Sequence, residues 1–170
     1  MLEQARRAPV TMTEKWQPVG QMQIAGLEVH EIKNVIFRNG VLTELFRDEW
    51  FDPPLAVRHI VHVAMLPGAT STWHCHKSQR DIIFPVRGQF RVGLYDDRPE
   101  SPTYRASAVI NAGVMRPGYY FVPPGVWHAL KNPTHETAAY VVINDEPYMY
   151  DDPDDWILPV GAAAIPCKLD

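Results

Sequence analysis

Three histidines and one aspartate are the residues whose types and spacing point most clearly to chemistry. His74 and His76 stand two positions apart, so on a β-strand both side chains would project from the same face. Asp81 follows a turn and is expected on the neighbouring strand, while His128 follows a Pro-Gly turn that feeds another strand. Imidazoles and a carboxylate that converge in this way could act as general acids and bases, or could bind one metal ion.

Short strands must position these residues, because no long helical period competes with the alternating pattern. Asn39-Gly40 between two apolar runs predicts a hairpin, and Pro123-Pro124-Gly125 predicts a tight turn before His128. Many short strands at regular spacing favour a sandwich or a barrel. We expect an early strand or hairpin at 22–29, with Ala25-Gly26 as a turn. The other expected strands cover residues 35–37, 41–46, 56–65, 81–86, 90–95, 108–110, 119–122, 129–130 and 138–143.

Length and composition limit the other possibilities. The chain has 170 residues, which fits one domain, and we divide it into an N-terminal arm (1–20), a barrel (21–150) and an irregular C-terminal wrap (151–170). The net charge of −4 and the absence of a Lys/Arg run argue against a nucleic-acid partner, and no apolar stretch is long enough to span a membrane. Two distant cysteines do not form a disulfide framework, so we expect a cytoplasmic protein.

Two motifs resemble the signature motifs of the cupin superfamily, and the resemblance implies an all-β fold, the RmlC-like double-stranded β-helix or jelly-roll barrel. In metal cupins these positions bind one metal, which implies a site for one divalent transition metal (Fe, Mn, Ni or Zn) at His74, His76, Asp81 and His128. Asp81 departs from the pattern, because metal cupins carry Glu there, and the Gly118 to Pro123 spacer is one residue short. The motifs read Gly68-x5-His74-x-His76-x4-Asp81-x6-Gly88 and Gly118-x4-Pro123-x-Gly125-x2-His128-x3-Asn132.

A closer resemblance, over residues 28–159, is to the shorter members of the dTDP-4-dehydrorhamnose 3,5-epimerase family. It is carried by the segments at 40–44, 73–77, 94–98, 101–104 and 122–128, of which Asp-Arg-x-x-Ser-Pro-Thr is the most specific. The family needs no metal: a histidine removes the proton next to a keto group and a tyrosine returns one on the opposite face. The resemblance places the base at His74, the acid at Tyr140 and a second barrel histidine at His128.

The same resemblance implies a carboxylate that orients the base, from a late segment that includes Asp154 and Asp155, with Asp81 as an alternative partner. Members are usually homodimers that exchange an N-terminal strand, a part that residues 22–29 could play. A small-molecule substrate is implied, at best a nucleotide-linked 4-keto-6-deoxy sugar.

The chain lacks the arginines with which this family grips the nucleotide diphosphate. Ser71 and Asn39 stand at two of those positions, with Arg38 and Arg58 nearby. Lys77 could replace a lysine that falls near Asp81. The remaining residues that we expect at the substrate are Glu44, His76 and His62, which shares a strand face with Arg58. A loss of charge-assisted bonds to phosphate would suit a substrate that has diverged from nucleotide sugars.

Three interpretations remain open on these residues. The leading one is a metal-free isomerase with no cofactor. The second is a metal-dependent cupin, an oxygenase or a metal isomerase, and the third is a non-catalytic cupin that binds a metabolite. Individually, Tyr140 could serve only for packing, and Asp81 could be a solvated strand end.

Overall fold

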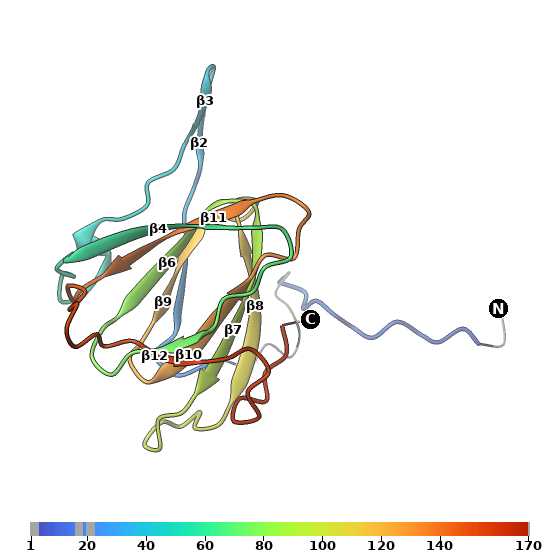
Figure 1. Cartoon of the computed structure of the whole chain (residues 1–170). Coiled ribbons are helices and arrows are strands. Elements are labelled where there is room, and N and C mark those ends of the chain that lie inside the picture. Colours follow the sequence, from blue (N-terminus) through green and yellow to red (C-terminus); the bar gives the residue numbers. More distant parts are fainter. Residues whose placement is uncertain (1–3, 16–18, 20–22, 170) are drawn as a thin grey trace.

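The computed structural model describes residues 4–15, 19 and 23–169, and its body is formed by two five-stranded antiparallel sheets that face each other (Figure 1). The first sheet has the order β1 (Glu28–Glu31), β9 (Gly118–Val122), β6 (Asp81–Arg87), β11 (Ala138–Asn144) and β4 (His59–Met65). The second has the order β12 (Trp156–Leu158), β5 (Trp73–Cys75), β10 (Val126–Lys131), β7 (Gln89–Asp96) and β8 (Ser107–Gly113). From β4 to β12, successive strands alternate between the sheets except for the neighbours β7 and β8, and the double-sheet all-β expectation is confirmed.

The space between the sheets holds the main core, and strand alternation explains which residues fill it. Phe90, Val92 and Leu94 of β7 are almost completely buried on one face, as their two-residue period predicts. They meet Ile83 and Tyr140 from the opposite sheet. The core is concentrated at the β7–β8 side of the body, which leaves room for a cavity at the other side.

Segments outside the sheets cover both outer faces. A cluster with Phe46, Trp50 and Phe51, around the short 3-10 helix η1 (Asp48–Trp50), packs against Ile82 and Phe84 of β6. This packing explains why the expected strand at 41–46 ends early: β3 (Gly40–Leu42) stops where the chain turns to cover the first sheet.

The C-terminal segment covers the other outer face. Ile165 and Leu169 pack on Trp73 of β5, which is 1% exposed. We had expected this segment to be irregular. Part of it is regular, because Trp156–Leu158 forms β12 and pairs with all three residues of β5. Pairing along β5 brings the residues just before β12 beside His74 and His76.

One hairpin projects away from the body. β2 (Val35–Phe37) pairs with β3 around the predicted Asn39-Gly40 turn, forming a separate two-stranded sheet at the top of Figure 1. Of the strand or hairpin expected at 22–29, the structure has the turn at Ala25-Gly26 and then β1, which begins at Glu28, while Met22 lies outside the described residues. Within residues 4–15, 19 and 23–169, no helix has the length and apolar character needed to cross a bilayer.

The loop after β7 is locked by a buried carboxylate. Asp96 is 0% exposed and accepts hydrogen bonds from Arg98, Ser101 and Thr103, which belong to the Asp-Arg-x-x-Ser-Pro-Thr string. Burial opposes ionisation, but these hydrogen bonds outweigh it and hold the pKa of Asp96 well below its ordinary value. The aliphatic part of Arg98 packs so closely on Gly125 that a Cβ there would lie 2.5 Å from it, so this lock also supports the turn before His128.

Candidate active site

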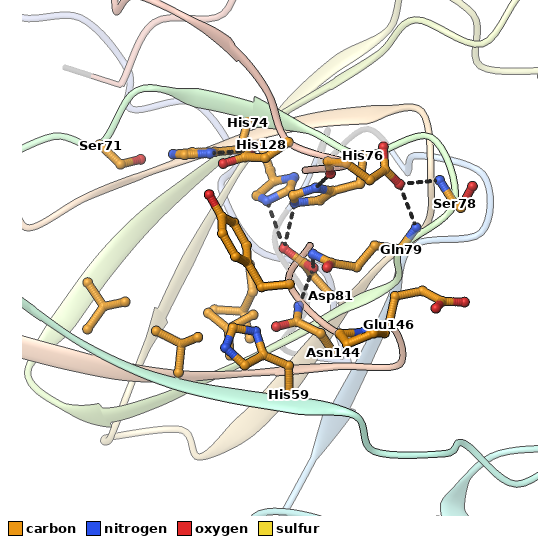
Figure 2. Close-up of a pocket in the computed structure, with 18 of the residues that line it drawn as sticks. His59, Ser71, His74, His76, Ser78, Gln79, Asp81, His128, Asn144 and Glu146 are labelled. Carbon is orange, nitrogen blue, oxygen red and sulfur yellow. Dashed lines mark hydrogen bonds and ion pairs between the residues drawn. The ribbon is translucent and has the colours of Figure 1, made fainter. Parts of the chain in front are cut away.

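A cavity of about 760 Å³ opens between the two sheets and contains most of the predicted residues. His74 and His128 reach it from the second sheet, while Asp81 and Tyr140 reach it from β6 and β11 of the first. Its size is in the range of pockets that hold small molecules. Figure 2 shows the labelled histidines His74, His76 and His128 gathered on one side of this space, with His59 across from them.

His74 has the geometry of an oriented base. Its neighbours Trp73 and Cys75 are buried in the outer layer, so strand alternation turns His74 inward. The Nδ1 atom lies 2.9 Å from Oδ1 of Asp155, whose carboxylate can only accept, so Nδ1 carries the proton. The lone pair is therefore on Nε2, where the Thr72 hydroxyl lies 2.9 Å away and can donate to it. The side chain is one-third exposed and lines the cavity.

Tyr140 lines the same cavity from the opposite sheet. It is 7% exposed, lies at a register shift between β11 and β6, and packs edge-on against Phe90 with ring centroids 5.4 Å apart. Burial, with a further contribution from the charge of Asp81, raises the pKa of Tyr140 to about 12. The phenol consequently keeps its proton at neutral pH and can act as an acid.

A second cluster lies deeper in the cavity around Asp81. Its Oδ2 is 3.3 Å from Nε2 of His76 and 3.2 Å from Nε2 of His128. Its Oδ1 accepts hydrogen bonds from the side-chain amides of Gln79 at 2.9 Å and Asn144 at 2.6 Å. The carboxylate is thus completely satisfied inside the barrel (dashed lines in Figure 2) and is not a solvated strand end.

The two histidines around Asp81 share one tautomeric constraint. Nδ1 of His76 donates to the backbone carbonyl of Asp154, and Nδ1 of His128 donates to the carbonyl of Val126 at 3.2 Å. Because each Nδ1 holds a proton, each Nε2 can approach the carboxylate favourably only with a second proton or a cation between them. Burial lowers the pKa of His76, but Asp81 outweighs it and raises that pKa to about 9. Burial also opposes ionisation of Asp81, and the two histidines still lower its pKa well below the ordinary value.

The cluster also meets a basic requirement for a metal site. One ligand atom from each of His76, Asp81 and His128 can be chosen so that all lie within 4.8 Å of one another. Their Nδ1 bonds to backbone carbonyls are typical of histidines that bind metal through Nε2. The fourth residue of the expected set, His74, is not grouped with them, and both of its nitrogens are engaged by Asp155 and Thr72.

Comparisons with known proteins agree with this geometry. Residues 61–144, which span β4 to β11, match the cupin domain family. The fold of this chain is the cupin fold. A probable low-salt glycan biosynthesis epimerase of Haloferax volcanii is 28% identical over 137 residues, which cover 80% of this chain and 88% of that protein.

Two solved structures share the fold. A dTDP sugar isomerase from Desulfovibrio desulfuricans G20 has a TM-score of 0.78 at 22% identity, covering 86% of this chain and 92% of the other. A dTDP-4-dehydrorhamnose 3,5-epimerase from Bacillus anthracis str. Ames, with TDP and PPi bound, has a TM-score of 0.74 at 15% identity and covers 85% and 88%. The expected cupin fold and the resemblance to this epimerase family are both confirmed.

Four residues expected at the substrate do not line the cupin cavity. Arg58 and His62 do share a strand face, but it is the outer one, because His59, Val61 and Val63 are the residues of β4 that turn inward. Lys77 points outward and lies over the Trp156 ring, with Nζ 4.0 Å from the centroid.

Glu44 is the fourth misplaced residue. It is exposed, outside the barrel, and forms an ion pair with Arg47 in the segment that covers the first sheet. Glu44 lies outside the barrel because β3 ends at Leu42 and the chain then turns across the first sheet. The local sequence did not indicate this early end.

Sequence reasoning missed several residues of the site. His59 and Asn144 line the cavity from β4 and β11, and Gln79 reaches it from the loop before β6. Asp154 was considered only as a partner of the base. Its carboxylate instead accepts the backbone N–H groups of residues 77, 78 and 79, which fixes the loop between His76 and Asp81. An Asp-Asp pair beside a short apolar strand, Asp154-Asp155 before Trp156, was the signal that could have indicated this role.

Proposed function

We propose that this cupin is an epimerase that removes and returns a proton next to the carbonyl of a sugar-like substrate. The observation that carries the proposal is the hydrogen bond from His74 Nδ1 to Asp155, which leaves Nε2 of a cavity-lining imidazole as the base. A carboxylate behind a histidine fixes its tautomer and stabilises the imidazolium that forms when it accepts a proton. The similarity to sugar epimerases supports this assignment.

The two sheets supply the two halves of the reaction. His74 on β5 would take the proton from one face of the substrate, and Tyr140 on β11 would return a proton on the other. An enolate forms between these steps, and the side-chain amide of Asn144 lines the cavity with two N–H groups, one of which is donated to Asp81 and the other of which could serve the enolate oxygen. Delivery from opposite faces inverts the carbon, which makes the reaction an epimerisation.

Solvent deuterium exchange tests this function. The wild-type protein and His74→Ala are incubated in deuterated buffer with a panel of keto sugars, and deuterium beside the carbonyl is followed by NMR. We expect exchange and inversion with the wild type and none with His74→Ala. His62→Ala is the matched control, because His62 is exposed on the outer face of β4. If His74→Ala still incorporated deuterium, the base would be another residue.

The proposed reaction uses only groups of the chain, so we propose that it needs no cofactor. A divalent transition metal (Fe, Mn, Ni or Zn) is the second candidate, favoured by the convergence of His76, Asp81 and His128. It would supply Lewis-acid or redox chemistry, and those three residues would hold it. Elemental analysis of untagged protein decides between the cofactor-free and the metal-dependent reaction. About one equivalent of metal in the wild type, lost in Asp81→Asn, would support the metal-dependent reaction.

We also propose that the protein is a homodimer in the cytoplasm. The β2–β3 hairpin carries five apolar side chains that are 48–81% exposed, and such patches usually mark protein contacts. Ile36, the most exposed of them, offers a test: Ile36→Asp should shift the mass measured by light scattering from dimer to monomer. Two free cysteines suit a reducing compartment, which subcellular fractionation would test.

A further inference from the structure

The charge of the cavity bears on the class of substrate. Among the described residues, neither lysine nor arginine lines it, and the stretches outside the described part contain neither residue type. Five carboxylates do line it: Asp81, Glu146, Asp152, Asp154 and Asp155. The lining therefore carries an excess of negative side chains.

Two cations that neighbour lining residues in the chain are committed elsewhere. Lys77 and Arg80 flank Ser78 and Gln79, which do line the cavity. Lys77 lies over Trp156, and Nε of Arg80 is 2.5 Å from Oδ2 of Asp145. His76 and His128 both turn Nε2 to Asp81, so these two nitrogens are committed to a carboxylate deep in the cavity.

The other four carboxylates of the lining differ in whether they have partners within the chain. Asp155 is bonded to His74, and Asp154 accepts three backbone N–H groups, so these two are satisfied within the chain. Glu146 and Asp152 are exposed and form no such contacts within the described part of the chain. Figure 2 shows Glu146 at the edge of the group of lining residues.

A diphosphate would be poorly bound in such a cavity. Protein sites for phosphate use Arg or Lys, or the N-terminus of a helix, to form charge-assisted hydrogen bonds. The described part of this chain has no α-helix, and the lining offers neutral polar groups instead, from Ser71, Thr72, Ser78, Gln79 and Asn144. Hydroxyl and amide groups match the hydroxyls of a sugar ring, and the apolar walls at Val61, Val63 and Leu130 match its C–H faces.

We infer that the substrate is an uncharged polyhydroxylated keto compound, such as a keto-sugar glycoside, and not a nucleotide diphosphate sugar. This inference rests on the proposed epimerase function and specifies its substrate class. The cavity then recognises only the sugar part, and the group attached to the sugar carries no phosphate.

A matched pair of substrates tests the inference. The methyl glycoside of a 4-keto-6-deoxyhexose and its dTDP-linked counterpart share the reacting carbon and differ in the diphosphate. Deuterium exchange by the wild-type protein should have a kcat/KM at least tenfold higher for the methyl glycoside. A higher kcat/KM for the dTDP-linked sugar would overturn the inference and leave the epimerase function standing.

Binding measurements keep the inference testable if neither compound exchanges, a result that would count against the proposed function alone. Calorimetric titration with dTDP and with inorganic pyrophosphate at low salt should show no binding up to 1 mM. Glu146→Lys should then bind both with a Kd below 1 mM, because it places a cation at the mouth. Glu136→Lys makes the same charge change in the exposed loop between β10 and β11, and should not gain affinity. Wild-type binding tighter than 1 mM would overturn the inference.

Discussion

Replacing Asp155 by Asn isolates the contribution of the carboxylate that orients the base. The substitution keeps the size of the side chain and removes the charge 2.9 Å from Nδ1 of His74. A hydrogen bond to a charged group contributes about 1.5–3 kcal/mol. Because the two side chains are 33% and 31% exposed, solvent screens the pair and the lower part of that range, about 1.5–2 kcal/mol, applies. With about 1.36 kcal/mol for each factor of ten, kcat should fall roughly 10- to 30-fold.

The assay is the initial rate of deuterium incorporation beside the carbonyl, measured at saturating substrate for the wild type and Asp155→Asn. Asp151→Asn is the matched control, because Asp151 is exposed and does not line the cavity. Thermal unfolding of each variant shows whether any loss of activity comes from a loss of fold. A kcat for Asp155→Asn within threefold of the wild type, in a stable protein, would refute the role of the carboxylate.

Three further substitutions test other parts of the structure. Tyr140→Phe should keep deuterium exchange through His74 but reduce inversion at least 100-fold, as followed by NMR; inversion at the wild-type rate would exclude Tyr140 as the acid. Asp96→Asn should lower the free energy of unfolding by about 2–3 kcal/mol at pH 7. Because the pKa of Asp96 is lowered from 3.8 in the folded state, the difference in free energy of unfolding between the wild type and Asp96→Asn should be complete above about pH 4 and should shrink below it. A difference that stays constant in urea titrations down to about pH 2.5 would contradict this. Gly93→Ala should destabilise the protein by about 1–3 kcal/mol, because a Cβ would lie 2.7 Å from Leu169 and 2.8 Å from Trp73; an unchanged urea midpoint would show that the C-terminal segment moves aside at no cost.

The sequence predicted most strands because turn signals separate them and their faces alternate. The two-residue spacing of His74 and His76 and the Pro-Gly turn before His128 were enough to expect these three histidine side chains inside the barrel, where they lie. These signals are local: each depends on a few neighbouring residues and on the pleat of one strand.

The face of β4 could not be predicted in the same way. Ile60 and Val61 are both apolar, so the strand lacks the alternation that would identify its inner face. The face is set by pairing with β11, which turns His59 inward and His62 outward. Successive side chains of a strand point to opposite faces, so choosing the wrong face exchanges every inward side chain for an outward one. This is why Arg58 and His62 were expected at the substrate.

The partner of the base required a contact between residues 81 positions apart. No spacing rule connects His74 to an irregular, Asp-rich segment, so Asp154 and Asp155 were both open as partners, with Asp81 as an alternative. The pairing of β12 with β5 resolves this, because it aligns Ile157 with His74 and brings the two preceding aspartates to the cavity.

The C-terminal segment therefore completes the site as well as covering the barrel. Asp155 orients His74, while the adjacent Asp154 fixes the loop after His76 through three backbone N–H groups and accepts the Nδ1 proton of His76 through its carbonyl. Two neighbouring residues thus set the tautomers of His74, in β5, and of His76, directly after it. The barrel supplies the cavity and the acid, but an imidazole with a defined lone pair exists only once β12 has paired. Activity should consequently depend on this short edge strand more steeply than the stability of the barrel does.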